Sequence, residues 1–396
     1  MRVSCRKCRA GETKAPTLDA LYLLSFMRTV ILILALLAAF RVAPAQTSNP
    51  QQLFVDGVQA QRRGDFQSAI RDYQEFLKLR PNNLEAEVNL GAALAHEGQF
   101  DDAIVLYRSA LSKAPGNKGV LLNLALAYYK KGDFPAALEQ FAPLHEQQPD
   151  NAQVAILLAD TDTRLGNPAE AVRVLSPLED KNSENSDFEY ALGSALISSG
   201  QRREGIARIE KVAKRENSAD AYLLAGSTLL DLNEFARGRD DLEIALRLNP
   251  QLPGIYSFVG TARDNTGDLK GAEAAFRQAL KINADDFTAN LYLGAMLSKR
   301  RELQEAKGYL EHALQLNPSS SMARYEFAMQ ESLSGQYEAA LRDLQAVAKA
   351  DPNWLEPHVE LANLYYRLHQ PQEGAKERQI VQEISAKQQA KSPQNP

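Results

Sequence analysis

The sequence predicts an all-α protein, a right-handed α-solenoid or superhelix of about ten helical hairpins. The first observation behind this prediction is a fixed repeat. Glycines follow one another at steps of 34 residues, at Gly64, Gly98, Gly132, Gly166 and Gly200. Alanines and prolines keep the same step, at Ala69, Ala103, Ala137 and Ala171 and at Pro81, Pro115 and Pro149. A period of this length is typical of proteins built from stacked repeats.

One repeat, residues 84–117, shows why each unit is expected to be a helical hairpin. Apolar and small side chains share one face of a first helix, at Val88, Leu90, Gly91 and Leu94. Gly98 suits the left-handed residue that ends a helix, and Asp101 and Asp102 suit the positive N-terminus of a second helix. The second helix has an apolar stripe at Ala103, Leu106, Tyr107, Ala110 and Leu111, and Pro115 ends it. One hairpin cannot bury both faces, so neighbouring hairpins are expected to stack.

The pattern resembles the tetratricopeptide repeat. In this copy the resemblance is carried by Leu90, Gly91, Gly98, Phe100, Ala103, Tyr107, Ala110 and Pro115. The register continues over residues 50–388 with one copy a residue short, which gives about ten copies and leaves little room for another domain. Residues 389–396 are polar and are expected to be disordered. The polar run 179–187 replaces a proline stop, and we interpret it as a longer solvated connection, with a hinge as the alternative.

Residues 27–45 have the features of a secretory signal peptide. Arg28 precedes the apolar run 29–40, and Ala43-Pro44-Ala45 is a small-x-small cleavage pattern. If translation starts at Met27, residues 1–26 are an upstream extension. If it starts at Met1, residues 1–26 are a basic cytoplasmic region and residues 20–40 can form an uncleaved membrane anchor. We therefore expect export to a periplasm or cell envelope, with an inner-membrane anchor and a periplasmic array as the alternative.

No arrangement of residues predicts catalysis, a cofactor site or a metal site. The five histidines are scattered over different repeats without an H-E-x-x-H motif, so we expect them on the surface or in a groove. Asp160 and Asp162 are two apart on one helix and diverge. Cys5 and Cys8 supply two ligands, whereas a structural zinc needs four. A net charge of −5 argues against broad nucleic-acid binding, so the expected partners are proteins.

In tetratricopeptide arrays the first helices line a concave groove, and the resemblance implies which side chains face it. They are Phe54, Val58, Val88, Leu122, Leu126, Tyr129, Lys130, Ile156, Asp160, Arg164, Tyr190, Ser194, Leu223, Ser227, Asp264, Leu291, Lys299, Tyr325, Met329, Asn363, Tyr366 and Arg367. Exposed apolar side chains of this kind usually mark a binding surface. The family's carboxylate clamp, Lys-Asn-Asn-Lys-Arg, corresponds here to Phe54, Val58, Asn89, Gly119 and Asn123. Only Asn89 fits, and without cations a carboxylate has no charge-assisted anchor, so we reject the clamp function.

These observations predict a non-enzymatic scaffold of the cell envelope that binds segments of partner proteins in the groove. Contact with the membrane is expected only through an uncleaved N-terminal anchor. The alternative is an accessory or spacer subunit of an envelope machine for polysaccharide export or outer-membrane assembly. A basic cluster on the second helix of the fifth copy would then matter more than the groove. Its members are Arg202, Arg203, Arg208, Lys211, Lys214 and Arg215, and they are either a solvated outer face or a patch for acidic partners or lipid headgroups.

Overall fold

The computed structural model describes residues 49–391, and every regular element in this range is a helix. The predicted fold class is confirmed, because successive helices pack against one another in pairs along the chain. The predictions for residues 1–26 and 27–45, including Cys5 and Cys8, lie outside the described residues, as do residues 392–396 of the expected tail. Within residues 49–391, no helix combines the length and the apolar character needed to cross a membrane.

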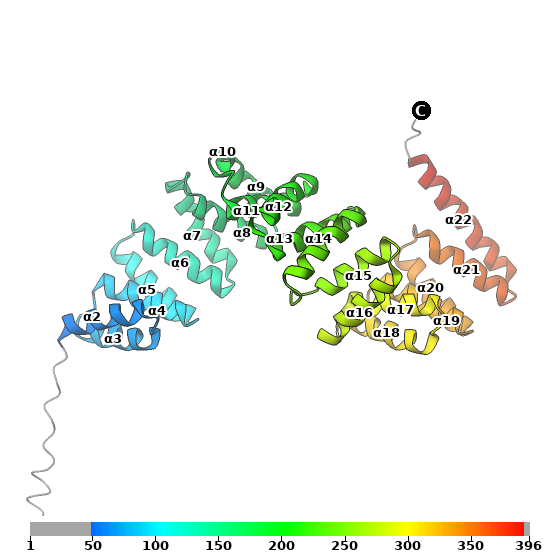
Figure 1. Cartoon of the computed structure of the whole chain (residues 1–396), viewed down its shortest axis with the longest axis horizontal. Coiled ribbons are helices and arrows are strands. Elements are labelled where there is room, and N and C mark those ends of the chain that lie inside the picture. Colours follow the sequence, from blue (N-terminus) through cyan, green and yellow to red (C-terminus); the bar gives the residue numbers. More distant parts are fainter. Residues whose placement is uncertain (1–48, 392–396) are drawn as a thin grey trace, which may run out of the picture. The chain divides into compact units, whose positions relative to one another are not determined.

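The chain divides into two compact units, one up to Asn123 and one from Leu124 onward. The division falls within α6 (Lys118–Lys131). Unit 1 contains α2 (Pro50–Arg62), α3 (Phe66–Leu79), α4 (Leu84–His96) and α5 (Phe100–Lys113). Each first helix of this unit lies beside the second helix of its own hairpin (Figure 1).

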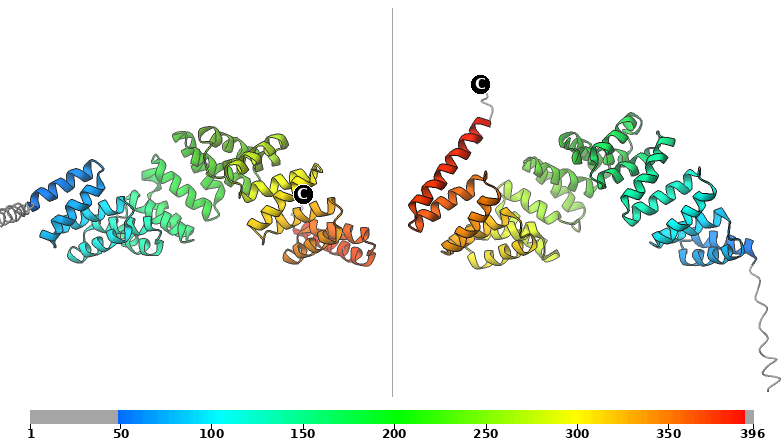
Figure 2. Two further views of the ribbon diagram at one scale, coloured as in Figure 1. Left: turned by 90° about the horizontal axis from the view of Figure 1, so that it is seen from below. Right: turned by 180° about the vertical axis from the view of Figure 1, so that it is seen from behind.

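Unit 2 repeats the same pairing many times (Figure 2). After α6 it contains α7 (Phe134–Gln147), α8 (Ala152–Arg164), α9 (Pro168–Leu175), a 3₁₀ turn (Ser176–Leu178), α10 (Glu179–Asn182), α11 (Ser186–Ser198), α12 (Arg202–Glu216), α13 (Ala219–Asp231), α14 (Phe235–Leu248), α15 (Ile255–Asn265), α16 (Leu269–Ile282), α17 (Phe287–Lys299), α18 (Leu303–Leu316), α19 (Ser321–Leu333), α20 (Tyr337–Ala350), α21 (Leu355–Arg367) and α22 (Pro371–Lys391). The described residues therefore form ten hairpins. The last helix continues to Lys391, past the boundary expected at residue 388.

The turn inside each hairpin contains one residue with left-handed backbone geometry. In seven hairpins it is the glycine of the 34-residue ladder, with φ between 78° and 92°, at Gly64, Gly98, Gly132, Gly166, Gly200, Gly267 and Gly335. In the other three it is Asn233 (φ 59°), Arg301 (φ 67°) or His369 (φ 58°). A side chain with a Cβ is disfavoured in this geometry. Each hairpin turn among the described residues therefore has a left-handed residue, including the three turns that lack glycine.

The two helices of a hairpin approach closely where the repeat places its small residues. A Cβ added to Gly91 on α4 would lie 2.7 Å from Cε1 of Tyr107 on α5. Tyr107 and Ala103, both on α5, are buried, as the sequence predicted. Gly260 faces Phe276 in the same way in unit 2. Glycine at this position lets a large buried ring pack directly against the first helix.

The run 179–187 is not the fully solvated connection that the sequence suggested. It begins with the short helix α10 and includes Asn185, the N-cap of α11, whose side chain accepts a hydrogen bond from the Phe188 backbone. Glu179 and Glu184 of this run form ion pairs with α12. Ion pairs with α12 therefore attach this segment to the next hairpin, although it lacks the proline that ends the second helix in other repeats. The interpretation of this run as a hinge stays a prediction.

Candidate functional site

A cleft of about 310 Å³ lies on the face formed by the first helices α6, α8 and α11 in unit 2. Five of the residues predicted for the groove come together there, namely Tyr129, Ile156, Asp160, Tyr190 and Ser194. The rest of the lining is Gln153, Leu157, Ala159, Thr163, Asp187 and Ala191. The walls thus come from three successive hairpins, because the 34-residue register returns equivalent positions to the same face.

One wall of this cleft is a network of three polar side chains. Asp160 Oδ2 accepts hydrogen bonds from the Tyr129 hydroxyl and from Arg164 Nε, the latter at 2.7 Å. Arg164 Nε also lies 3.1 Å from the Tyr129 hydroxyl, and the guanidinium sits 5.4 Å from the centre of the Tyr129 ring. Burial, and then Asp160, raise the pKa of Tyr129, so the hydroxyl stays protonated and remains a donor. The network fixes the ring of Tyr129 at the edge of the cleft.

Tyr190 on α11 also lines the cleft. Burial raises the pKa of its phenol, and the negative charge of Asp220 adds to the effect. Tyr190 also lines a second, more polar hollow together with Glu184, Asp187 and Glu216. The exposed carboxylate of Asp187 borders both hollows and has no ion-pair partner among residues 49–391. The site therefore offers apolar walls, two phenols and the unpaired carboxylate of Asp187, which suits binding better than bond-making chemistry.

The remaining predicted groove residues are distributed along both units. Phe54 on α2 packs its ring 5.3 Å from that of Phe76 on α3, so the core of the first hairpin uses part of its surface. Val58, Val88, Leu122 and Leu126 are half-buried and Lys130 is exposed. Leu291 was expected in the groove, but it is only 4% exposed because it packs with Leu310, Ala313 and Ala323.

The last two predicted residues are already engaged within unit 2. The Arg378 guanidinium on α22 lies 4.4 Å from the centre of the Tyr366 ring. Arg367 donates to the Tyr337 hydroxyl at 3.2 Å and lies over the ring of Tyr337. A partner would therefore meet Tyr366 and Arg367 with part of their surface covered.

Tyr325 and Met329 on α19 are half-buried. Burial, and then the charges of three acidic residues that were not predicted for the groove, raise the pKa of Tyr325 to about 12. These are Glu326 on α19 and Glu356 and Glu360 on α21. A signal for two of them was present, because Tyr292, Glu326 and Glu360 follow one another at steps of 34 residues. They occupy one register position on successive first helices.

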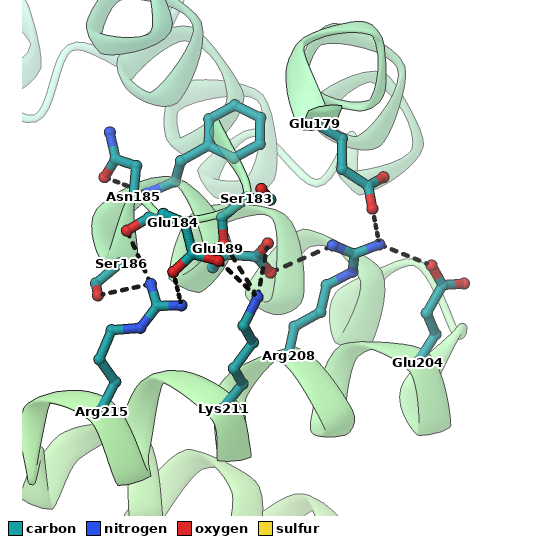
Figure 3. Close-up of polar contacts among 11 residues, drawn as sticks. Glu179, Ser183, Glu184, Asn185, Ser186, Glu189, Glu204, Arg208, Lys211 and Arg215 are labelled. Atoms are coloured by element: carbon teal, nitrogen blue, oxygen red, sulfur yellow. Dashed lines mark hydrogen bonds and ion pairs between the residues drawn. The ribbon is translucent and has the colours of Figure 1, made fainter. Parts of the chain in front are cut away.

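The basic cluster on α12 is largely neutralised by the chain itself (Figure 3). Arg208 Nη2 lies 2.6 Å from Glu179 Oε1, and Arg208 Nη1 lies 3.2 Å from Glu189 Oε2. Arg215 Nη2 lies 2.9 Å from Glu184 Oε2. Arg208 is 16% exposed, so the interpretation as a solvated face is wrong for this residue. Among the other members, Arg202, Arg203, Lys211 and Lys214 are exposed.

Buried titratable groups elsewhere do not converge on a reaction centre. His358 was expected on the surface or in a groove, but it is buried and its Nδ1 lies 2.6 Å from Glu377 Oε2. Burial raises the pKa of Glu331 to about 7 and that of Asp241 to about 6. No group of three or more potential metal ligands occurs within residues 49–391. The first-helix face is thus the candidate site.

Family models described as tetratricopeptide repeat match residues 57–118, 94–161, 190–253 and 260–326, together more than half of the chain. The chain belongs to the tetratricopeptide repeat family. Proteins of this family are in general scaffolds for protein interactions, and the fold is typically not catalytic.

Curated relatives match only part of the chain. The chain is 22% identical over 148 residues to anaphase-promoting complex subunit 3 of Schizosaccharomyces pombe, and this match covers 37% of the chain and 22% of that protein. It is 28% identical over 165 residues to tetratricopeptide repeat protein 34 of Mus musculus, which covers 35% of this chain and 30% of that protein. The chain therefore spans less than a third of the length of these relatives. A solved structure, the Cut9–Hcn1 hetero-tetramer of the APC/C, matches 86% of this chain and 88% of that chain with 15% identity and a TM-score of 0.51, a likeness of fold alone.

Proposed function

We propose that this protein is a scaffold of the cell envelope that binds segments of partner proteins on the face formed by its first helices. One observation carries the proposal: the cleft that joins Tyr129, Asp160 and Tyr190 from three successive hairpins. Its apolar floor can bury a side chain of a partner, and its fixed hydroxyl and carboxylate groups can orient the partner's backbone. A segment of a few residues fits this volume, whereas a globular domain does not.

The envelope location rests on residues 27–45, which combine a basic start, an apolar run and a small-x-small pattern. We propose that this segment directs export and is removed, which leaves the repeats in the periplasm. Sequencing the N-terminus of the protein purified from its own cells tests this step. A mature chain that starts near Gln46 supports cleavage, and a chain that retains Met27 or Met1 favours the membrane anchor instead.

An accessory or spacer role in an envelope machine has less support. That role relied on the basic cluster of α12, and Arg208 and Arg215 are committed to carboxylates of the same chain. Only the exposed members of the cluster remain for a partner. We therefore keep the cleft as the leading site and treat Arg202 and Arg203 as the residues with which to test the alternative.

Site-specific photo-crosslinking tests the binding function. A photoreactive phenylalanine replaces Gln153, which lines the cleft, or Glu139, an exposed residue of α7 that serves as the control. We expect discrete protein adducts from position 153 in the native host and none of the same mass from position 139. Ser194→Phe, which fills the cleft without removing a native contact of Tyr129, should abolish those adducts. Adducts that persist in the Ser194→Phe protein would refute the assignment of the cleft.

A further inference from the structure

Four carboxylates lie without partners on the first helices of the last hairpins of unit 2. They belong to Asp264 on α15, Glu326 on α19, and Glu356 and Glu360 on α21. None of them forms a hydrogen bond or ion pair with another side chain in the described part of the chain. Glu273 on the second helix α16 differs in this respect, since it lies within 2.9 Å of both Arg277 and Arg300. The four first-helix carboxylates are therefore available to pair with a cation from outside the chain.

Aromatic rings accompany these carboxylates. The rings of Tyr325 and Trp354 meet at 4.9 Å between centroids, at the junction of α19 and α21. Burial, and then the charges of Glu360, Glu326 and Glu356, raise the pKa of Tyr325 to about 12. Met322, about one helical turn before Tyr325 on α19, is 45% exposed. The face thus presents carboxylates together with electron-rich rings, the two groups that attract ammonium and guanidinium ions.

The cations on the same helices do not balance the carboxylates. Lys299 acts on Glu326 and lowers its pKa, which opposes the larger effect of burial. The arginines of α15, α19 and α21 are already engaged, Arg263 with Glu243, Arg324 with Asp343 and Arg367 with Tyr337. A negative potential therefore remains on this face and would draw positively charged segments toward it.

We propose that the face of α15, α17, α19 and α21 binds a cationic peptide segment, rich in lysine or arginine, of a partner protein. The assignment deepens the proposed scaffold function and depends on it. Each cation of the segment would pair with a carboxylate that has no partner in the free protein, and its aliphatic stem would lie over Tyr325, Trp354 or Met322. This polarity is opposite to that of the carboxylate clamp, which needs a basic groove.

The fluorescence of Trp354 reports on this site directly, because Trp354 is the single tryptophan of the chain. The probe is a short peptide in which lysine alternates with alanine, and its counterpart has glutamate in place of lysine. We expect the lysine peptide to change the Trp354 emission saturably and with an affinity that falls as salt is added. The glutamate peptide should leave the emission unchanged. Equal responses to both peptides would overturn the proposal.

Charge-removing variants locate the binding. Glu356→Gln combined with Glu360→Gln should weaken binding of the lysine peptide about five- to tenfold, the effect of losing two partly exposed charge pairs. The matched control is Glu338→Gln combined with Glu383→Gln, which removes the same charge from exposed positions of α20 and α22. The control pair should bind the peptide like the unaltered protein. Equal weakening by both pairs would show diffuse attraction to net charge and would refute the site.

Two further outcomes distinguish binding of a partner segment from self-association and from loss of the scaffold function. Self-association that depends on Glu356 and Glu360, measured by sedimentation without peptide, would replace the partner segment with a second copy of the chain and overturn the proposal. If the lysine peptide does not bind but the crosslinks from position 153 are intact, only the proposal of a cationic ligand is refuted. If the crosslinks fail as well, the scaffold function on which this inference rests is also refuted.

Discussion

Glu331 is a buried carboxylate at a position that most other repeats fill with an apolar or aromatic residue, and this makes stability depend on pH. It is 7% exposed, and its Oε2 has no hydrogen-bond partner among the described residues. One repeat earlier the same register position holds buried Leu297, and one repeat later it holds buried Tyr365. Burial is the main reason that the pKa of Glu331 rises from 4.5 to about 7, and the charge of Asp343 adds to it.

The direction of the pH effect follows from the two pKa values. Below pH 4.5 the group is protonated in both the folded and the unfolded chain and carries no penalty. As the pH rises through 7 the folded chain must bury a charge, so stability is lost between about pH 4.5 and pH 7. The size of the rise in pKa corresponds to about 3 kcal/mol of unfolding free energy at pH 8.

The test compares the unaltered protein with Glu331→Gln and Glu331→Leu at pH 5 and pH 8. Because repeat arrays do not unfold in a single step, amide hydrogen exchange of α19 and α20 is the appropriate measurement. We expect the protection of these helices to fall between pH 5 and pH 8 in the unaltered protein, after correction for intrinsic exchange, and to fall less in both variants. Glu338→Gln, at an exposed position of α20, should behave like the unaltered protein. The same loss of protection in all four proteins would refute the reasoning.

Other predictions concern packing, turns and charge. Gly91→Ala should destabilise the first unit by about 1–3 kcal/mol in urea unfolding, because the added Cβ meets the ring of Tyr107 at 2.7 Å; an unchanged midpoint would contradict the packing. Arg301→Gly should stabilise its hairpin by up to about 1 kcal/mol and raise the melting temperature, because glycine adopts the φ of 67° at this turn without strain. A lower melting temperature than that of the unaltered protein would show that the Arg301 side chain has another role. Arg208→Met should lower the free energy of unfolding by about 3 kcal/mol, because it leaves the carboxylate of Glu189, which is 4% exposed, without its closest cation. Adding Glu189→Gln should restore part of that loss. Additive losses in the double variant would argue against the pairing.

Much of the fold could be predicted from the sequence, because small, turn and apolar residues mark the same positions in most repeats. The small residue at Gly91, the left-handed turn at Gly98 and the buried stripe from Ala103 to Tyr107 all occupy the expected places. The turns at Asn233, Arg301 and His369 were harder to find, since backbone geometry and not residue type defines the position.

The candidate site was predictable only in part. The register identified Tyr129, Asp160 and Tyr190 as members of one face, but it gave no information on their hydrogen bonds. Leu291 is buried despite its register position because α18 and α19 pack over it, and a repeat pattern does not report how closely neighbouring hairpins approach. The basic cluster of α12 was misread for a related reason, since its partners come from a segment without repeat character.

The attachment of the run 179–187 to α12 has a mechanical consequence. Most neighbouring hairpins are joined by apolar burial, which added salt does not weaken. At this junction exposed ion pairs, such as Arg215 with Glu184, share the task, and screening reduces their strength. We therefore expect the ionic strength to change how firmly the fourth hairpin is held against the fifth, as at other junctions of unit 2 that carry exposed ion pairs, such as Arg277 with Glu305.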